Sequence, residues 1–338
     1  MADVKTLDLD DLAARVTDAL AGGRPGARVS GLETLPGGTS SLTYSATVDD
    51  AGGSAPVVVK VAPPGIPPVR NRDMIRQARI LEVLHDVPGV AVPAVYATDA
   101  GDPPDVPPFF VMEFVPGESI EPVGAPNDAL DPATMDTRAR AAMRMAAAMH
   151  RTSAIDLGLD GEPAKSPRDE VAHWERSFSS VEGDLHPPVV DECTAGLYAT
   201  VPEPMTPVIM HGDWRLGNMQ CVGPDIKAVI DWEIWAVGDP RVEIAWFLLM
   251  SDTSRAPHMV GNGVPSLAEL QAEYERAAGR SLDAMDWFAA LVRYKQAAAS
   301  ALIIKNALKR DPDSPVARNM GAGLTGNLAG CKRILDAL

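Results

Sequence analysis

Two short polar motifs, each placed directly after an apolar segment, restrict the folds open to this chain of 338 residues. Residues 211–218 read HGDWRLGN and follow the apolar residues 208–210, while residues 231–233 read DWE and follow the apolar residues 228–230. A short apolar run bounded by polar residues is consistent with a buried strand. The pattern therefore predicts two loops at strand ends, joined by a hairpin, and such loops commonly carry functional side chains.

Three side chains of these motifs have the chemistry and spacing that phosphoryl transfer requires. Asn218 comes five residues after Asp213, and Asp231 comes thirteen residues after Asn218. Transfer to a hydroxyl needs a carboxylate that accepts the hydroxyl proton, and oxygen ligands that hold Mg²⁺ against a triphosphate. Protein kinases use the same Asp-x-x-x-x-Asn spacing followed by a second Asp. The alternative is that the three residues only cap turns, but the agreement over 21 residues favours a site.

Hydrophobic periodicity predicts strands in the first third of the chain and helices in most of the rest. The early segments predict helices over 8–21 and 73–85 and strands at 29–35, 42–48, 57–61, 90–97 and 109–115. Asp131 followed by Pro132 predicts the start of a long helix that ends at His150. Further helices are predicted over 168–178, 267–278, 284–310 and 316–338. This order indicates an α+β fold.

Composition argues against several classes of protein. The chain has 46% hydrophobic and 22% charged residues, which is ordinary for a globular protein. Its net charge of −16, with no basic stretch, argues against partners such as nucleic acid or an anionic membrane. No apolar run reaches the ~20 residues of a membrane span, and the acidic N-terminus does not resemble a secretory signal. Three cysteines far apart, Cys193, Cys221 and Cys331, fit free thiols, so a cytoplasmic protein is expected.

The whole block over residues 210–247, MHGDWRLGNMQCVGPDIKAVIDWEIWAVGDPRVEIAWF, resembles the aminoglycoside phosphotransferase and choline kinase superfamily. Within it, the block is most similar to the kinase-like domains fused to acyl-CoA dehydrogenases. The resemblance extends over about 35–247. It implies a bilobed protein-kinase-like fold, with a nucleotide-binding lobe over 1–115 built from an antiparallel sheet and one helix. A hinge near 112–117 would lead to a larger, mostly helical catalytic and substrate-binding lobe over 116–338.

The resemblance also implies a reaction and the roles of the motif residues. The family transfers the γ-phosphate of ATP, or of GTP in some members, to a hydroxyl group of a small molecule. By this resemblance Asp213 would be the catalytic base, and Asn218 and Asp231 would be the ligands of Mg²⁺.

A second set of residues is expected to bind the nucleotide. Gly37, Gly38 and Ser40 resemble the family's nucleotide-covering loop, in which glycines let the backbone approach and a serine contacts a phosphate. Lys60 stands alone in an apolar strand, so it needs a partner or a ligand, and the resemblance makes it the contact to the α- and β-phosphates.

The adenine base is expected to lie against a third group of residues. Backbone groups of Glu113 and Val115 would bind its edge at the hinge, and Ile230 would cover it. The alternative for each is an ordinary apolar strand.

Two positions leave alternatives open. Gln77 stands where the resemblance predicts a glutamate that pairs with the strand lysine, and Asp73, one helical turn earlier, is a possible substitute. A neutral hydrogen bond from the lysine is weaker than a charged one, which lowers the expected rate. Arg215 either offsets phosphate charge or pairs with Asp239 or Glu243.

The acceptor and the oligomeric state are not determined by these patterns. The negative net charge favours a cationic acceptor, whereas the resemblance to dehydrogenase-fused domains favours an anionic acyl thioester. Aminoglycosides, other antibiotics, choline and sugars are further candidates from the family. A pseudokinase-like module that binds nucleotide without turnover is the main alternative to a kinase, and a hydrolase that uses Asp213 to activate water is a weaker one.

Overall fold

The computed structural model describes residues 7–35, 41–122, 130–255 and 262–338. The chain divides into two compact units. The first combines Met1–Ile120 with Leu216–Trp235, and the second combines Glu121–Arg215 with Ala236–Leu338. The hairpin between the two polar motifs thus belongs to the N-terminal unit. The functional lobes and the hinge expected from the resemblance stay predictions.

The first unit contains a five-stranded antiparallel sheet with the order β1-β2-β3-β5-β4. Its strands are β1 (Arg28–Thr34), β2 (Leu42–Asp50), β3 (Gly53–Val61), β4 (Val95–Asp99) and β5 (Phe109–Glu113). The unit also holds a two-stranded sheet of β8 (Met219–Val222) and β9 (Asp225–Val229). A turn joins β2 to β3, and Asp50 stabilises it by accepting a hydrogen bond from the Gly52 amide at 2.7 Å.

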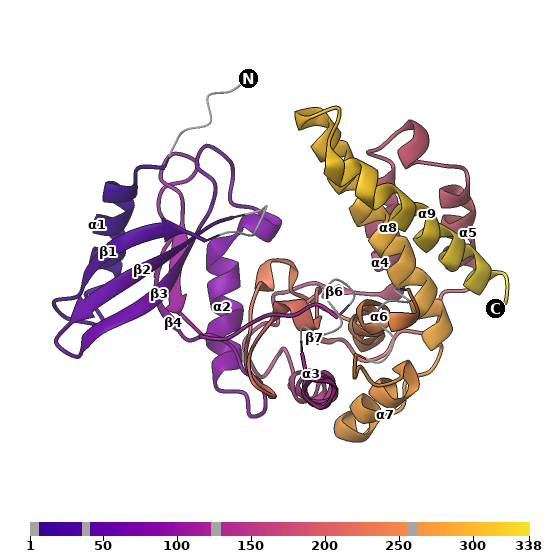
Figure 1. Cartoon of the computed structure of the whole chain (residues 1–338), viewed down its shortest axis with the longest axis horizontal. Coiled ribbons are helices and arrows are strands. Elements are labelled where there is room, and N and C mark those ends of the chain that lie inside the picture. Colours follow the sequence, from indigo (N-terminus) through magenta and orange to yellow (C-terminus); the bar gives the residue numbers. More distant parts are fainter. Residues whose placement is uncertain (1–6, 36–40, 123–129, 256–261) are drawn as a thin grey trace. The chain divides into compact units, whose positions relative to one another are not determined.

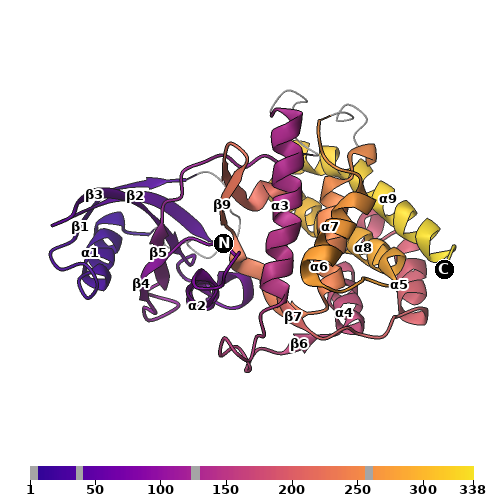
Figure 2. The same cartoon turned by 90° about the horizontal axis from the view of Figure 1, so that it is seen from below.

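Helix α1 (Leu9–Leu20) covers one face of the five-stranded sheet (Figures 1 and 2). Its apolar stripe packs in one cluster with alternate residues of the central strand, the members being Leu12, Val16, Leu20, Val57, Val59 and Val61. Because successive side chains of a strand point to opposite faces, Lys60 faces away from α1. Helix α2 (Met74–His85) contacts β4 and β5.

The second unit is mostly helical. Its helices are α3 (Pro132–His150), α4 (Pro167–Phe178), α5 (Val189–Ala199), α6 (Pro240–Ser251), α7 (Leu267–Ala278), α8 (Met285–Arg310) and α9 (Pro315–Leu335). A small sheet has the order β6-β10-β7, from β6 (Ala164–Lys165), β10 (Ala236–Gly238) and β7 (Val208–Met210). Helices α8 and α9 lie side by side (Figure 1), and α3 packs along α7 (Figure 2). Helices α4, α5, α6, α8 and α9 share one apolar core.

Most predicted elements are present, and the differences have local causes. Asp131 caps α3 as predicted, accepting a hydrogen bond from the Thr134 amide at 3.0 Å. The predicted strand over 90–97 is wrong at its start, since β4 begins only at Val95. Pro93 has no N–H for a sheet hydrogen bond, which explains the late start. Among the described residues, no helix has the length and apolar character needed to span a membrane.

A buried ion pair at the start of α6 yields a stability prediction. Both oxygens of Asp239 accept hydrogen bonds from Arg241, at 3.0 and 2.8 Å, and Oδ2 also accepts one from the Met205 amide at 2.9 Å. Arg241 is 1% exposed, so Asp239→Ala leaves a buried cation without its main partner and is expected to cost about 3–5 kcal/mol. Urea unfolding measures this cost. Asp225→Ala, which removes an exposed pair with Lys227, should change stability by less than about 1 kcal/mol. Equal effects of the two variants would contradict the prediction.

Candidate active site

The β8–β9 hairpin brings the two predicted magnesium ligands of the first unit close together in the fold. Met219 lies opposite Val229 in the hairpin, and the Ile230 amide donates to the Asn218 carbonyl oxygen at 2.9 Å. Asn218 therefore lies across from Ile230, the residue that directly precedes Asp231. Asn218 is buried and Ile230 is half-buried.

Asp231 is the ion-pair partner of the strand lysine. Lys60 Nζ donates to Asp231 Oδ1 at 3.2 Å, and Lys60 is only 7% exposed. The Asp231 side chain is 38% exposed, so it remains accessible to a ligand. Its backbone is left-handed, with φ 68° and ψ 54°, a conformation that few residues other than glycine adopt. Strained residues of this kind cluster at functional sites.

Helix α2 is tied to the loop that follows Asp231. The Arg76 guanidinium lies 3.8 Å from the centre of the Trp235 ring and donates to the Trp235 carbonyl at 3.1 Å. Trp235 Nε1 donates back to the Arg76 carbonyl at 3.2 Å. Two hydrogen bonds and one cation–π contact thus connect the helix to the segment that follows the second motif.

Gln77, which stands where the resemblance predicts a glutamate, makes a neutral hydrogen bond. Gln77 is 2% exposed and donates through Nε2 to the Asn71 carbonyl at 2.9 Å. Its Oε1 atom is buried and has no hydrogen-bond partner among the described residues. Asp73, the possible substitute, caps α2 by accepting from the Arg76 amide at 3.0 Å. Asp231 is therefore the acidic partner that this structure gives to Lys60.

The structure describes two of the remaining residues that are predicted to bind nucleotide, Glu113 and Val115. Glu113 ends β5, and its amide donates to the Ala94 carbonyl oxygen at 2.8 Å, while its Oε2 accepts from the Ala94 amide at 3.3 Å. Val115 follows β5 and is half-buried. The predicted phosphate-loop residues Gly37, Gly38 and Ser40 lie outside the described residues. The assignments of all these residues stay predictions.

In the second unit, Asp213 is held by two donors. Trp246 Nε1 donates to Oδ1 at 2.8 Å, and Arg215 Nε donates to Oδ2 at 3.0 Å. Arg215 also donates to Glu121 Oε2 at 2.9 Å. Each carboxylate oxygen of Asp213 retains capacity for another hydrogen bond, because an ionised oxygen can accept more than one.

The two partners proposed for Arg215 from the sequence were wrong. Asp239 is buried and pairs with Arg241, and Glu243 is buried and pairs with His150, so neither acid is the partner of Arg215. Arg215 instead pairs with Asp213 and Glu121. No local pattern could indicate Glu121, which lies 94 residues from Arg215 in the chain.

A buried chain of hydrogen bonds, from Gly212 through Glu243 and His150 to Tyr274, stabilises the backbone of the first motif. Glu243 Oε1 accepts from the Gly212 amide at 2.8 Å, and Oε2 accepts from His150 Nε2 at 3.0 Å. With that proton on Nε2, His150 Nδ1 accepts from the Tyr274 hydroxyl at 2.9 Å, and the same hydroxyl accepts from Arg280 at 3.0 Å. The chain fixes the backbone immediately before Asp213.

Lys295, on α8, is a residue near Asp213 that the sequence patterns did not indicate. It is 7% exposed and donates to the Gly212 carbonyl oxygen at 2.6 Å. A single lysine with apolar neighbours at helical spacing, Leu291 and Ala298, was the available signal, because a buried lysine needs a partner.

The charges around Asp213 favour its ionised form. Burial alone would raise the pKa of the Asp213 carboxyl, but the positive charges of Arg215 and Lys295 hold that pKa below its ordinary value. Burial also lowers the pKa of Lys295, while the charge of Asp213 opposes this effect. Asp213 therefore carries a negative charge at neutral pH and can accept a hydrogen bond from a hydroxyl.

The residues of the first unit suit Mg²⁺ bound together with a phosphate ligand. No group of three or more His, Cys, Asp or Glu side chains in the described part of the chain could hold a metal by itself. Asn218 and Asp231 are hard oxygen ligands, and Mg²⁺ commonly takes only one or two carboxylates plus substrate phosphates and water. The donor set therefore fits an ion that binds with nucleotide.

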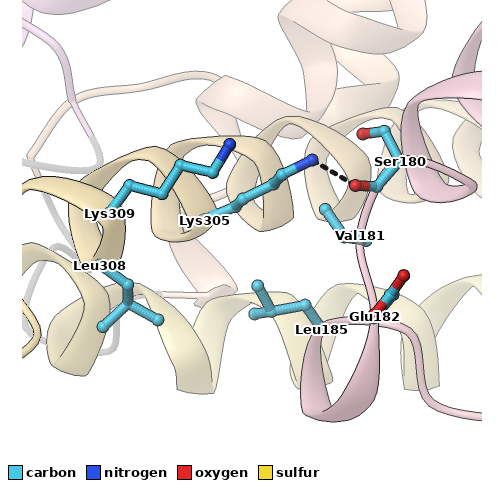
Figure 3. A pocket seen from close by; sticks show the side chains of 7 residues that line it. All are labelled: Ser180, Val181, Glu182, Leu185, Lys305, Leu308 and Lys309. Atoms are coloured by element: carbon cyan, nitrogen blue, oxygen red, sulfur yellow. Dashed lines mark hydrogen bonds between the residues drawn. The ribbon is translucent and has the colours of Figure 1, made fainter. Parts of the chain in front are cut away.

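A surface pocket of the second unit is separate from these residues. It has a volume of about 480 Å³ and lies between the end of α8 and the segment after α4 (Figure 3). Its lining residues are Ser180, Val181, Glu182, Leu185, Lys305, Leu308 and Lys309. Lys305 points to Ser180 and donates to its carbonyl oxygen. The lining contains none of the predicted site residues, so this pocket is not the candidate active site.

Comparison with known proteins shows the family of this chain. Residues 31–291 match the pattern of the Phosphotransferase enzyme family. The chain belongs to this family. Human acyl-CoA dehydrogenase family member 11 is 25% identical over 256 residues, which are 71% of this chain and 32% of that protein. Mouse acyl-CoA dehydrogenase family member 10 is 25% identical over 178 residues, 52% of this chain and 16% of that protein. The chain thus spans about a third or less of these relatives' length.

Solved structures confirm the predicted α+β fold for this phosphotransferase-family chain. A Ralstonia eutropha structure, provisionally assigned as an aminoglycoside phosphotransferase, has a TM-score of 0.77, 20% identity and coverage of 98% and 99% of the two chains. A thermostable mutant of the aminoglycoside phosphotransferase APH(4)-Ia, in a ternary complex with ADP and hygromycin B, has a TM-score of 0.60, 14% identity and coverage of 95% and 98%. The macrolide 2′-phosphotransferase of Brachybacterium faecium has a TM-score of 0.59, 20% identity and coverage of 94% and 97%.

Proposed function

We propose that this phosphotransferase-family protein moves the γ-phosphate of ATP, together with Mg²⁺, to a hydroxyl group of a small molecule. The observation that carries the proposal is the ionised Asp213 carboxylate, fixed by Trp246 and Arg215 directly after a strand. Five residues later the chain supplies Asn218, and the same hairpin leads to Asp231 and its partner Lys60. These are the residue types that an in-line phosphoryl transfer requires.

Each residue has one task in the proposed reaction. Asp213 accepts a hydrogen bond from the acceptor hydroxyl, orients its oxygen toward the γ-phosphorus and takes its proton as the bond to phosphorus forms. Lys60 pairs with phosphate oxygens of the nucleotide. Asn218 and Asp231 would hold Mg²⁺, which when bound neutralises charge on the phosphates. Most of the rate then comes from positioning and from charge stabilisation, since no covalent intermediate is needed.

The relatives support nucleotide use. Two thermostable mutants of APH(4)-Ia were solved as ternary complexes, one with ADP and hygromycin B and the other with AMP-PNP and hygromycin B. We infer that the acceptor here is also a hydroxyl-bearing small molecule. Its class is to be found with a panel of aminoglycosides, choline-like amines, sugars and hydroxyacyl thioesters.

Calorimetric titration of AMP-PNP into the wild-type protein, with and without Mg²⁺, tests the proposal before any acceptor is known. The expected result is binding that Mg²⁺ strengthens by about tenfold or more, followed by transfer from γ-labelled ATP to at least one member of the panel. Binding without any transfer would favour the pseudokinase-like module. No binding in either condition would overturn the proposed function.

A further inference from the structure

Lys295 contacts the backbone of the first motif, and the proposed reaction does not give this residue a role. It comes from α8, is almost fully buried and donates to the Gly212 carbonyl oxygen at 2.6 Å. Gly212 directly precedes Asp213 and also donates its amide to Glu243. Burying an ammonium group is costly unless it is paired, so its place beside this backbone calls for a compensating interaction.

The Trp246 ring joins Lys295 to Asp213. Lys295 Nζ lies 4.2 Å from the centre of the ring, while the ring Nε1 donates to Asp213 Oδ1 at 2.8 Å. The face of an aromatic ring is negative and its edge is positive. The cation on the face and the carboxylate at the N–H edge therefore stabilise the same orientation of the indole.

We propose that Lys295 and Trp246 act as one unit that positions the ionised Asp213 carboxylate. Lys295 is a positioning residue, because it holds the Gly212 carbonyl and the Trp246 ring rather than a substrate. The inference rests on the proposed function, in which Asp213 orients the acceptor hydroxyl, but it concerns how that carboxylate is held.

The charged neighbours of this unit come from several elements. They are His211 and Arg215 from the motif, Glu121 before α3, His150 on α3, Glu170 and His173 on α4 with Lys165 before that helix, and Glu243 on α6. Lys165 pairs with Glu170, His150 pairs with Glu243, and Arg215 pairs with both Glu121 and Asp213. Among the acids that act on the charge of Lys295, Asp213 has the largest effect, ahead of Glu170 and Glu243. Together with Arg215, Lys295 lowers the pKa of the Asp213 carboxyl despite the burial.

Titration of the Asp213 carboxyl by ¹³C NMR tests the proposal directly. The signal is assigned by its loss in Asp213→Asn, and the wild-type midpoint is compared with that of Lys295→Met. Removing the cation is expected to move the midpoint to higher pH, because an attraction that favoured the ionised form is lost. The acid limb of kcat/KM should move in the same direction, and kcat should fall by about 10–100-fold with little change in KM.

Lys305→Met is the matched control. Lys305 lies on the same helix and also donates to a backbone carbonyl, that of Ser180 (Figure 3). It is ten residues from Lys295, or about 15 Å along the helix, where screening weakens its effect on Asp213. Its Asp213 midpoint should match the wild type. A midpoint in Lys295→Met equal to that of Lys305→Met would overturn the proposal.

Trp246→Phe provides a second route if Lys295→Met fails to fold. It keeps an aromatic ring, a phenyl in place of the indole, but removes the N–H donor, so the Asp213 midpoint should again rise. An unchanged midpoint in this variant would also overturn the proposal. The titration needs neither nucleotide nor acceptor. Absence of transfer in the wild type would therefore refute the proposed function while leaving this measurement intact.

Discussion

Replacing Asp213 with asparagine is expected to lower the rate of phosphate transfer by about 10²–10⁴-fold, the usual range for losing general base catalysis. The amide still accepts the hydrogen bond from Trp246 at Oδ1, while its NH2 group cannot accept from Arg215, which keeps its hydrogen bond to Glu121. The amide cannot accept the hydroxyl proton. Binding of AMP-PNP with Mg²⁺ should stay within a few-fold of the wild type, because Asp213 is not assigned a contact to nucleotide.

Single-turnover transfer from γ-labelled ATP to the acceptor found in the panel measures this loss. Asp225→Asn is the matched control, since Asp225 is an exposed aspartate at the tip of the β8–β9 hairpin, 67% exposed and paired with Lys227. That variant should transfer phosphate at the wild-type rate. A rate in Asp213→Asn within tenfold of the control would remove Asp213 from its assigned role as base.

The variant Asp231→Asn is expected to abolish most of the gain in nucleotide affinity that Mg²⁺ confers. Removing a residue that only hydrogen-bonds to a metal ligand lowers metal affinity by about 10–100-fold. Removing the negative charge of the ligand itself, here Asp231, should lower the Mg²⁺ affinity at least as much. Asparagine is the informative substitution because it tolerates the left-handed backbone at φ 68°, whereas alanine would add strain. The effect of Asp231→Asn is therefore not confounded with backbone distortion.

Titration of AMP-PNP at several Mg²⁺ concentrations checks this expectation, with Asp225→Asn again as the control. Without Mg²⁺ the Asp231→Asn protein should bind the nucleotide at least as well as the wild type, because Lys60 loses its ion-pair partner and becomes available to phosphate. If Mg²⁺ still strengthens binding in Asp231→Asn as it does in the control, Asp231 is not a metal ligand.

Local sequence patterns were sufficient to locate the two motifs, their flanking strands and the long helix that begins after Asp131. Each of these depends on residues close together in the chain: an apolar run followed by polar residues, or a cap followed by proline. Even the failure at β4 was local, because Pro93 delays the strand. The resemblance of residues 210–247 to a known family was likewise readable in one continuous block.

Which residues surround Asp213 was decided only by the tertiary structure. Trp246 lies 33 positions from Asp213, and Lys295 lies 83 positions from Gly212. No periodicity links residues so far apart, because their contact depends on how α6 and α8 pack in the shared core of the second unit. For the same reason the sequence suggested the wrong partners for Arg215, whereas folding placed Glu121 beside it and buried the expected acids against Arg241 and His150.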